Sequence, residues 1–421
     1  MRKAMVLLVV ATLFGGISSV SYAGTTPKAG GPCTKINQVA VAGGLKFTCS
    51  KIGSKLRWDK GEKIKMLPPT PSTSPTPSTS PTPSTSPTPS TSPTPIIPTS
   101  FQDLDSHLLG IGYGAWTKGV QHIQAGSNVV GNLKVLVGPN TTVADPNPLD
   151  AFSKASLLYY QSQQVKNLYL IEFSKVDTAW AQQQYDALHP RNYDPNAAAH
   201  QCHPNNGCIG AAAGVTTSGD GVIIYGQGGI QYPGPNGQPD PRQTNGDVLA
   251  HEYTHTIQMV NAPCNSSLGC YGQLPQWLLE GEADWSGLTA ASTDSYQSYI
   301  NFRKFILESI PGSLTKTTFT PDWVNTYLGP NLVFLPNQDN WAYWNANPKY
   351  SPDLAYSIGT MATEILVSVK GPEAVMNLYQ DVGTGMTFAQ SFQKEFGLSW
   401  TDALPLIAKV ISDEIQQNIN N

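Results

Sequence analysis

A proline-rich repeat divides this chain into two parts that fold separately. The hexamer Pro-Thr-Pro-Ser-Thr-Ser begins at Pro69, Pro75, Pro81 and Pro87. Such a tract has little apolar surface to bury, so it favours an extended polyproline conformation of about 3.1 Å per residue. We therefore predict a spacer over residues 67–99, between a small module at residues 24–66 and a main domain at residues 100–421.

The N-terminus has the three parts of a secretory signal peptide. Arg2 and Lys3 supply positive charge, residues 5–17 are apolar, and Ser21-Tyr22-Ala23 is a small-residue cleavage site. The apolar run is shorter than the roughly 20 residues that a transmembrane helix needs, which disfavours the alternative of a membrane anchor. We predict a signal peptide over residues 1–23 and a mature chain, without a transmembrane span, that is secreted and extracellular or cell-wall associated.

The six cysteines are an even number, which suits an oxidising compartment. They can pair in several ways, and their spacing suggests three local disulfides: Cys33–Cys49, Cys202–Cys208 and Cys264–Cys270. An alternative for the second group is a small metal site built from His200, Cys202, His203 and Cys208, although a secreted chain favours the disulfide.

The segment 24–66 is strongly basic, with nine lysine and arginine residues against two acidic ones. Alternating residues at 39–41 and 45–48, around Gly43-Gly44, predict short strands, and so few residues need a disulfide to stabilise them. Gly31-Pro32-Cys33, Thr48-Cys49 and Lys55-Leu56-Arg57-Trp58 resemble a small repeat of actinobacterial exported proteins. The charge suggests contact with an anionic cell-wall polymer; a solvated basic tether is the alternative.

The main domain is acidic, because the whole chain has a net charge of −4 although residues 24–66 are basic. This charge argues against a nucleic-acid partner. Strand-like runs occupy 133–137, 168–173 and 221–226, and helical patterns lie near 151–165, 176–188, 246–260, 275–291, 294–310, 353–369, 371–380 and 399–417. A β-rich first half followed by a helical second half predicts an α+β fold.

The strongest motif is His251-Glu252-Tyr253-Thr254-His255 within the helical pattern 246–260. Histidines four residues apart lie on one face of a helix, so both rings can reach one metal ion. From the next position, Glu252 can reach a metal-activated water without binding the metal. An amphipathic helix with two ordinary buried histidines is the alternative. The metzincin continuation of the motif, Gly and then His, is excluded because these positions are Gln258 and Asn261.

A second motif, Trp277-Leu278-Leu279-Glu280-Gly281-Glu282-Ala283-Asp284-Trp285, follows on the next predicted helix. It resembles the second metal helix of gluzincin peptidases, in particular the peptidase MA-like group with a thermolysin-like zincin fold. The resemblance implies that Glu280 is the third zinc ligand and that Asp284 orients His251 from behind. Glu282 is the alternative ligand, but it lies about 200° around the helix from Glu280, so only one of them can face the metal.

The resemblance covers about residues 130–415. Tyr356-Ser357-Ile358-Gly359 resembles a downstream Tyr-x-x-Gly segment, which implies that Tyr356 stabilises an oxyanion; a tyrosine of the core is the alternative. Lys370-Gly371-Pro372 and residues 388–400 resemble the closing helices. The strand Val222, Ile223, Ile224 and Tyr225 is placed like the zincin edge strand that pairs with an extended substrate.

These residues imply a secreted Zn²⁺ peptidase that acts on a protein or peptide, with Glu252 as the general base for a metal-activated water. Two alternatives stay open. One is a zinc exopeptidase on short peptides, for which no amine-binding motif stands out. The other is a wall-attached binding protein that keeps the fold without turnover, which would have no need of Glu252.

Overall fold

The computed structural model describes residues 28–33, 39–42, 45–60, 62–63, 94–127, 130–142, 147–203, 207–228, 245–263, 273–308, 316–329 and 353–417. The predicted signal peptide, the Gly43-Gly44 turn, most of the spacer and the Cys264–Cys270 pair lie outside these residues. The chain divides into two compact units between Pro89 and Ser90, inside the predicted spacer. Within the described ranges, every helix is too short or too polar to cross a bilayer.

The first unit is a small antiparallel sheet. Strand β2 (Leu45–Ile52) pairs with β1 (Val39–Ala42), β3 (Lys55–Trp58) and β4 (Glu62–Lys63). Cys49 and Trp58 lie opposite each other on β2 and β3, and both are buried beside the Cys33–Cys49 disulfide. The predicted strands and this predicted disulfide are confirmed.

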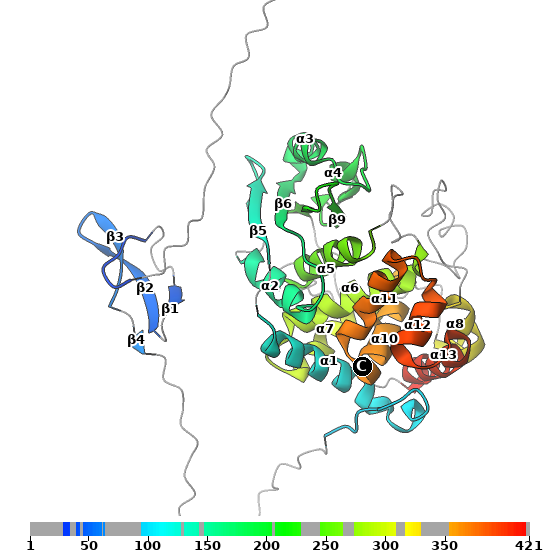
Figure 1. Ribbon diagram of the computed structural model, residues 1–421. Coiled ribbons are helices and arrows are strands. Elements are labelled where there is room, and N and C mark those ends of the chain that lie inside the picture. The colour runs from blue at the N-terminus through cyan, green and yellow to red at the C-terminus, as the bar shows by residue number, and fades with distance from the viewer. Residues whose placement is uncertain are drawn as a thin grey trace, which may run out of the picture. The chain divides into compact units, whose positions relative to one another are not determined.

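The second unit is an α+β domain with a four-stranded sheet in the order β5-β6-β10-β9 (Figure 1). β5 (Asn132–Val137), β6 (Asn167–Ser174) and β10 (Gly221–Gln227) are parallel, and β9 (Ala211–Val215) runs antiparallel to β10. The crossover from β5 to β6 contains α2 (Pro148–Leu158). Between β6 and β9 lie α3 (Thr178–Leu188), α4 (Ala197–His200) and the pair β7 (Cys202–His203) and β8 (Gly207–Cys208).

Strand β10 lies inside the sheet. Its side chains alternate between two packed faces, as the pleat of a strand requires: Val222 and Ile224 belong to the cluster beneath α3, whereas Ile223 and Tyr225 face α5. β10 pairs with β6 along one side and with β9 along the other. The expectation that Val222–Tyr225 forms a substrate-pairing edge is therefore wrong, because its backbone groups already have partners on both sides.

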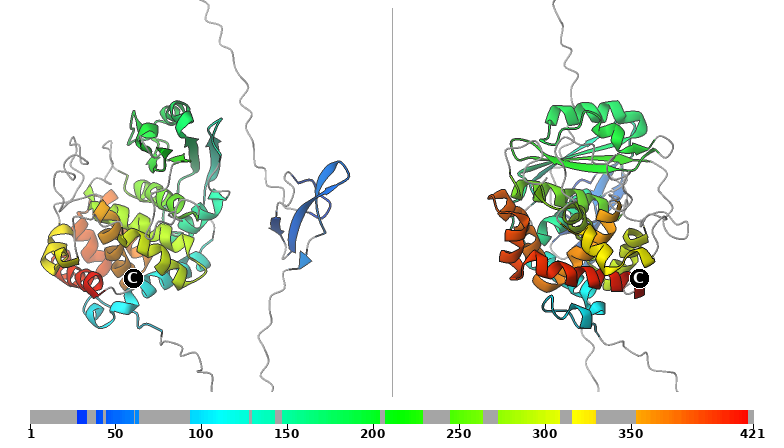
Figure 2. Two further views of the ribbon diagram at one scale, coloured as in Figure 1. Left: turned by 180° about the vertical axis from the view of Figure 1, so that it is seen from behind. Right: turned by 90° about the vertical axis from the view of Figure 1, so that its right-hand side faces the viewer.

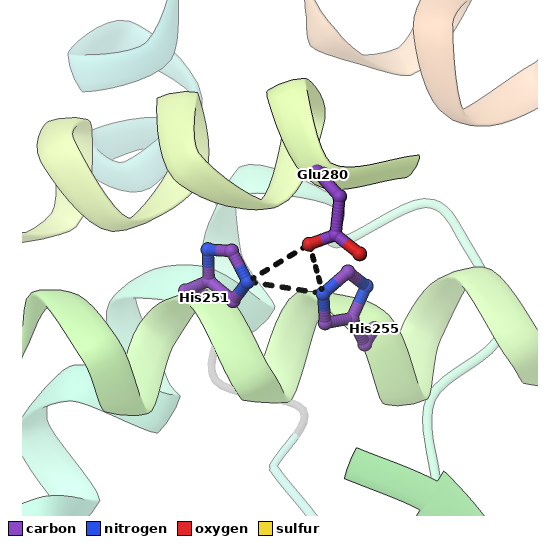
Figure 3. A group of neighbouring side chains, drawn as sticks. All are labelled: His251, His255 and Glu280. Carbon is purple, nitrogen blue, oxygen red and sulfur yellow. Dashed lines mark hydrogen bonds and ion pairs between the residues drawn. The ribbon is translucent and has the colours of Figure 1, made fainter. Parts of the chain in front are cut away.

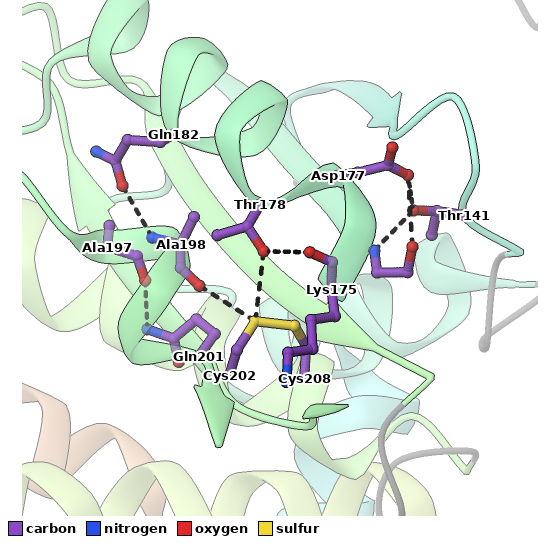
Figure 4. The surroundings of a disulfide bond; sticks show 11 residues. Thr141, Lys175, Asp177, Thr178, Gln182, Ala197, Ala198, Gln201, Cys202 and Cys208 are labelled. Carbon is purple, nitrogen blue, oxygen red and sulfur yellow. Dashed lines mark hydrogen bonds between the residues drawn. A yellow bond between two sulfur atoms is a disulfide. The ribbon is translucent and has the colours of Figure 1, made fainter. Parts of the chain in front are cut away.

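The predicted Cys202–Cys208 disulfide is confirmed, which rules out a metal site using these two sulfur atoms. It joins β7 to β8 beside α3 and α4 (Figure 4). Thr178, at the start of α3, donates a hydrogen bond to the carbonyl of Lys175 at 2.7 Å, and the Cys202 sulfur lies 3.9 Å from the Thr178 hydroxyl. The nearby His200 Nδ1 lies 2.6 Å from Asp194 Oδ2.

Helices form the rest of the domain (Figure 2). They are α1 (Leu108–Ala125), α5 (Asp247–Asn261), α6 (Gln276–Ala291), α7 (Tyr296–Glu308), α8 (Pro321–Tyr327), α10 (Asp353–Lys370), α11 (Pro372–Gly383), α12 (Phe388–Phe396) and α13 (Trp400–Gln417). Helices α5 and α6 are buried around almost their whole circumference, so the two helices that carry the motifs lie at the centre of the domain.

A buried ionic group ties three of these helices together away from the motifs. Arg303 of α7 binds Glu364 of α10 through Nε and Nη2, and Glu414 of α13 accepts a second bond from Nη2 at 2.9 Å. The Tyr299 hydroxyl donates to Glu364 at 2.5 Å. All four side chains are almost completely buried, so these charges depend on one another for compensation.

Candidate metal centre

Helix α5 presents the two histidines of the first motif to one place. The helix begins after Gly246, whose φ of 89° is a left-handed conformation that suits glycine. His251 and His255 then lie one turn apart on the same face, and each is less than a tenth exposed. Their Nε2 atoms are 3.0 Å apart.

Helix α6 supplies the third side chain of the cluster. Glu280 points from α6 toward the two rings (Figure 3), and its Oε2 lies 3.6 Å from His251 Nε2 and 3.4 Å from His255 Nε2. Its other oxygen, Oε1, accepts a 2.9 Å hydrogen bond from Gln276 Nε2, one turn earlier on α6. Gln276 thereby fixes which carboxylate oxygen faces the histidines.

The spacing of these three atoms fits a tetrahedral metal ion. Bonds of about 2.0–2.1 Å at the tetrahedral angle place neighbouring ligand atoms roughly 3.3 Å apart, close to the three measured separations. Two imidazole nitrogens and one carboxylate oxygen are also donors that zinc accepts. His251, His255 and Glu280 could therefore hold a metal ion. Within the described residues the group has no fourth histidine, cysteine or acid, as in metal sites that leave a position open for chemistry.

The Nδ1 atom of each histidine ring has its own hydrogen-bond partner. Asp284, on α6, has Oδ1 2.6 Å from His251 Nδ1. Gln258, on α5, has Oε1 2.8 Å from His255 Nδ1. Glu282, the alternative ligand, does not join the cluster: it lies on another side of α6 and accepts a 3.0 Å hydrogen bond from Gln258 Nε2.

The cluster is electrostatically coupled. Burial alone lowers the pKa of the His251 imidazole, but Asp284, assisted by Glu280 and Glu252, raises it well above its usual value. Burial likewise opposes the charged form of His255, yet Glu280 raises its pKa. Burial would raise the pKa of Glu280, whereas the two imidazoles lower it far below the ordinary range. The pocket thus favours an anionic Glu280 beside positive charge, which a metal cation also supplies.

Glu252 and Tyr356 border the same cluster. Glu252 is buried, which raises its pKa, while the neighbouring His251 and His255 oppose that effect. The Tyr356 ring stacks on the His251 ring with centroids 6.0 Å apart. Burial, followed by the charge of Glu280, raises the pKa of the Tyr356 phenol, so the hydroxyl keeps its proton.

A glycine contact positions Tyr356 relative to the metal-ligand helix. A Cβ at Gly281 of α6 would lie 2.1 Å from the carbonyl carbon of Gly359, and a Cβ at Gly359 of α10 would lie 2.2 Å from the Trp277 carbonyl oxygen. Only glycine allows two backbones to approach so closely. The Gly281–Gly359 crossing brings the helix bearing Tyr356 against the helix bearing Glu280.

The structure brings together His251, Glu252, His255, Glu280, Asp284 and Tyr356, all predicted as site residues, whereas Val222–Tyr225 lie within the sheet. Gln258 was missed as a partner of His255. Its sequence signal is a polar residue three positions after a ligand, on a helix that is otherwise buried. Comparisons of the chain with family models, with curated proteins and with solved structures found no match.

Proposed function

We propose that this chain is an exported zinc-dependent peptidase of the gluzincin type, similar to peptidase MA-like proteins. The observation that carries the proposal is the triangle of His251 Nε2, His255 Nε2 and Glu280 Oε2, with edges of 3.0, 3.4 and 3.6 Å. A buried carboxylate on the residue after the first histidine is the further group that hydrolysis requires.

His251, His255 and Glu280 would hold the zinc ion. When bound, zinc supplies Lewis-acid polarisation of a carbonyl and makes a water acidic enough to act as a nucleophile near neutral pH. Its preference for mixed nitrogen and oxygen donors matches the cluster.

The chain's own residues would then move protons and stabilise charge. Glu252 accepts a proton from the attacking water and passes it to the leaving amine. The Tyr356 hydroxyl, which keeps its proton, donates to the oxygen that becomes negatively charged.

An extended peptide would pair with β9. β9 is the end strand of the sheet and packs against α5. Gly226 N donates to Gly210 O at 2.8 Å, so the alternation of an antiparallel ladder turns the backbone groups of Ala211 outward. Among the described residues, none hydrogen-bonds the backbone of Ala211. Ala213 O and Val215 O already accept hydrogen bonds from Asn192 Nδ2 and Arg191 N, so a substrate would pair with the β9 edge at Ala211, in place of β10.

The disulfides Cys33–Cys49 and Cys202–Cys208 support export of the chain to an oxidising compartment. We further propose that the basic segment 24–66 holds the enzyme near an anionic cell-wall polymer. Such attachment would concentrate the domain on wall-associated protein.

The test compares zinc-loaded full-length chain with its Glu252→Gln variant for hydrolysis of casein. We expect both to hold zinc and the variant to lose about 10²–10⁴ in rate, because only the general base is removed. Glu414→Gln, an equally buried acid outside the cluster, is the matched control and should retain activity.

Equal hydrolysis by the wild type and Glu252→Gln would remove Glu252 from the mechanism. Zinc binding by the wild type with no hydrolysis of casein or of short peptides would instead favour the binding-protein alternative.

A further inference from the structure

We propose that Gln258 is a positioning residue that holds the His255 imidazole in its metal-binding tautomer. The inference rests on the metal site of the proposed function and assigns the group that orients its second histidine. Gln258 Oε1 lies 2.8 Å from His255 Nδ1, and the Gln258 side chain is completely buried.

The orientation of the Gln258 amide is fixed from its other end. Gln258 Nε2 donates to the backbone carbonyl of Leu279 at 3.1 Å and to Glu282 Oε2 at 3.0 Å. A backbone carbonyl oxygen can only accept a hydrogen bond, so the NH₂ group must face α6 and the amide oxygen must face His255. A flipped amide would leave a buried donor and a buried acceptor facing like groups.

The tautomer of His255 follows from this orientation. An amide oxygen is an acceptor only, so the Nδ1 atom of His255 must carry the proton that it donates. Nε2 of the neutral ring then presents its lone pair toward His251 and Glu280. Gln258 thus accepts a hydrogen bond from His255 Nδ1, as Asp284 does from His251 Nδ1. Because Gln258 is uncharged, it adds no carboxylate to the three of Glu252, Glu280 and Asp284.

Glu282 acquires a role through the same contact. It lies two residues after Glu280, is completely buried, and accepts a hydrogen bond from Gln258, which in turn contacts His255. In the Glu280-Gly281-Glu282 sequence of α6, Glu280 is therefore the metal ligand, and Glu282 accepts the hydrogen bond that holds the Gln258 amide in place.

The experiment measures Zn²⁺ affinity of the full-length chain by competition with a chelating dye, together with thermal unfolding of the metal-free protein. Gln258→Met keeps the length of the side chain but removes its acceptor, and we expect zinc to bind about 10–100-fold more weakly. The double variant Gln258→Glu with Glu282→Gln exchanges the two groups: it keeps an acceptor for His255 Nδ1 and a donor between the two side chains, and it should bind zinc at least about tenfold more tightly than Gln258→Met.

Ser286→Ala is the matched control. Ser286 is an equally buried residue of α6 whose hydroxyl contacts Thr254 of α5 and no ligand, so its loss should leave zinc affinity unchanged. A purely structural role for Gln258 predicts no such recovery, because the double variant still loses the hydrogen bond from residue 258 to the Leu279 carbonyl. The inference is overturned if Gln258→Met binds zinc as tightly as Ser286→Ala, or if the double variant binds it no better than Gln258→Met. A wild type that binds no zinc at all would instead overturn the proposed function, and the inference with it.

Discussion

Asp284 Oδ1 lies 2.6 Å from His251 Nδ1, and Glu280, one turn earlier on the same helix, has its Oε2 3.6 Å from His251 Nε2. A single helix therefore contacts both nitrogens of one imidazole. Asp284 sets the direction of the ring, and Glu280 completes the donor set on its other side.

Replacing Asp284 should weaken metal binding without removing a ligand. We expect Asp284→Ala to lower zinc affinity about 10–100-fold, because the His251 ring loses the acceptor that fixes its tautomer. Asp294→Ala removes an exposed acid after the end of α6 and should have no such effect. Dye competition measures both variants, and equal affinities would show that Asp284 does not orient His251.

Adding a methyl group at Gly359 should force α10 away from α6. The new Cβ would lie 2.2 Å from the Trp277 carbonyl oxygen, and overpacking against backbone typically costs about 1–3 kcal/mol. Urea unfolding of Gly359→Ala measures this loss. In Gly119→Ala the nearest atom is the side-chain Cγ2 of Thr289, which can shift, so this control should lose less stability. A Gly359→Ala chain as stable as the control would contradict the close helix crossing.

The Arg303 group should make stability depend on pH. It contains one cation and the carboxylates of Glu364 and Glu414. Burial raises the pKa of Glu414 to about 7 from 4.5, although Arg303 opposes the shift. Because the folded state binds this proton more tightly, the stabilisation is complete below pH 4.5 and is lost as the pH rises through about 7.

Glu414→Gln keeps the shape of the protonated acid and cannot ionise. Its melting temperature should therefore fall less than that of the wild type as the pH rises through that range. Glu364→Gln is the contrasting variant: it breaks the two-point pair with Arg303 and should cost about 3–5 kcal/mol near neutral pH. Parallel melting curves for the wild type and Glu414→Gln would contradict the assignment.

Local periodicity was enough to predict the helices that carry the cluster. The predicted helices 246–260 and 275–291 differ by at most one residue at each end from α5 and α6, because their apolar residues repeat at the helical period. Periodicity showed that only one of Glu280 and Glu282 can face the metal, and the resemblance to the gluzincin motif favoured Glu280, which is the acid that joins the two histidines.

Elements whose position depends on distant partners were not predictable in this way. β10 was correctly predicted as a strand, but its place inside the sheet is set by β9, whose sequence Ala-Ala-Ala-Gly-Val has weak β propensity. The helix predicted at 151–165 ends at Leu158. The backbone N–H of Gln161 binds the Glu373 carboxylate instead of a helical carbonyl, a contact over 212 positions that no local pattern reveals.

Helix α1 was missed for a related reason. Its glycines lower its intrinsic helix propensity, yet one of them is required by packing: a Cβ at Gly110 would lie within 2 Å of the Ile96 carbonyl oxygen. Ile111 and Ala115 of α1 are completely buried in the main core. Helix α1 is therefore a core helix of the domain.

The most direct test of the cluster is the zinc content of the purified full-length chain and of its Glu280→Ala variant after dialysis against buffer with equal free zinc. We expect one zinc ion per wild-type chain and a large loss of affinity in Glu280→Ala, with both proteins folded by far-UV circular dichroism. Wild-type protein that retains no zinc, or a Glu280→Ala variant that binds it as tightly as the wild type, would contradict the account.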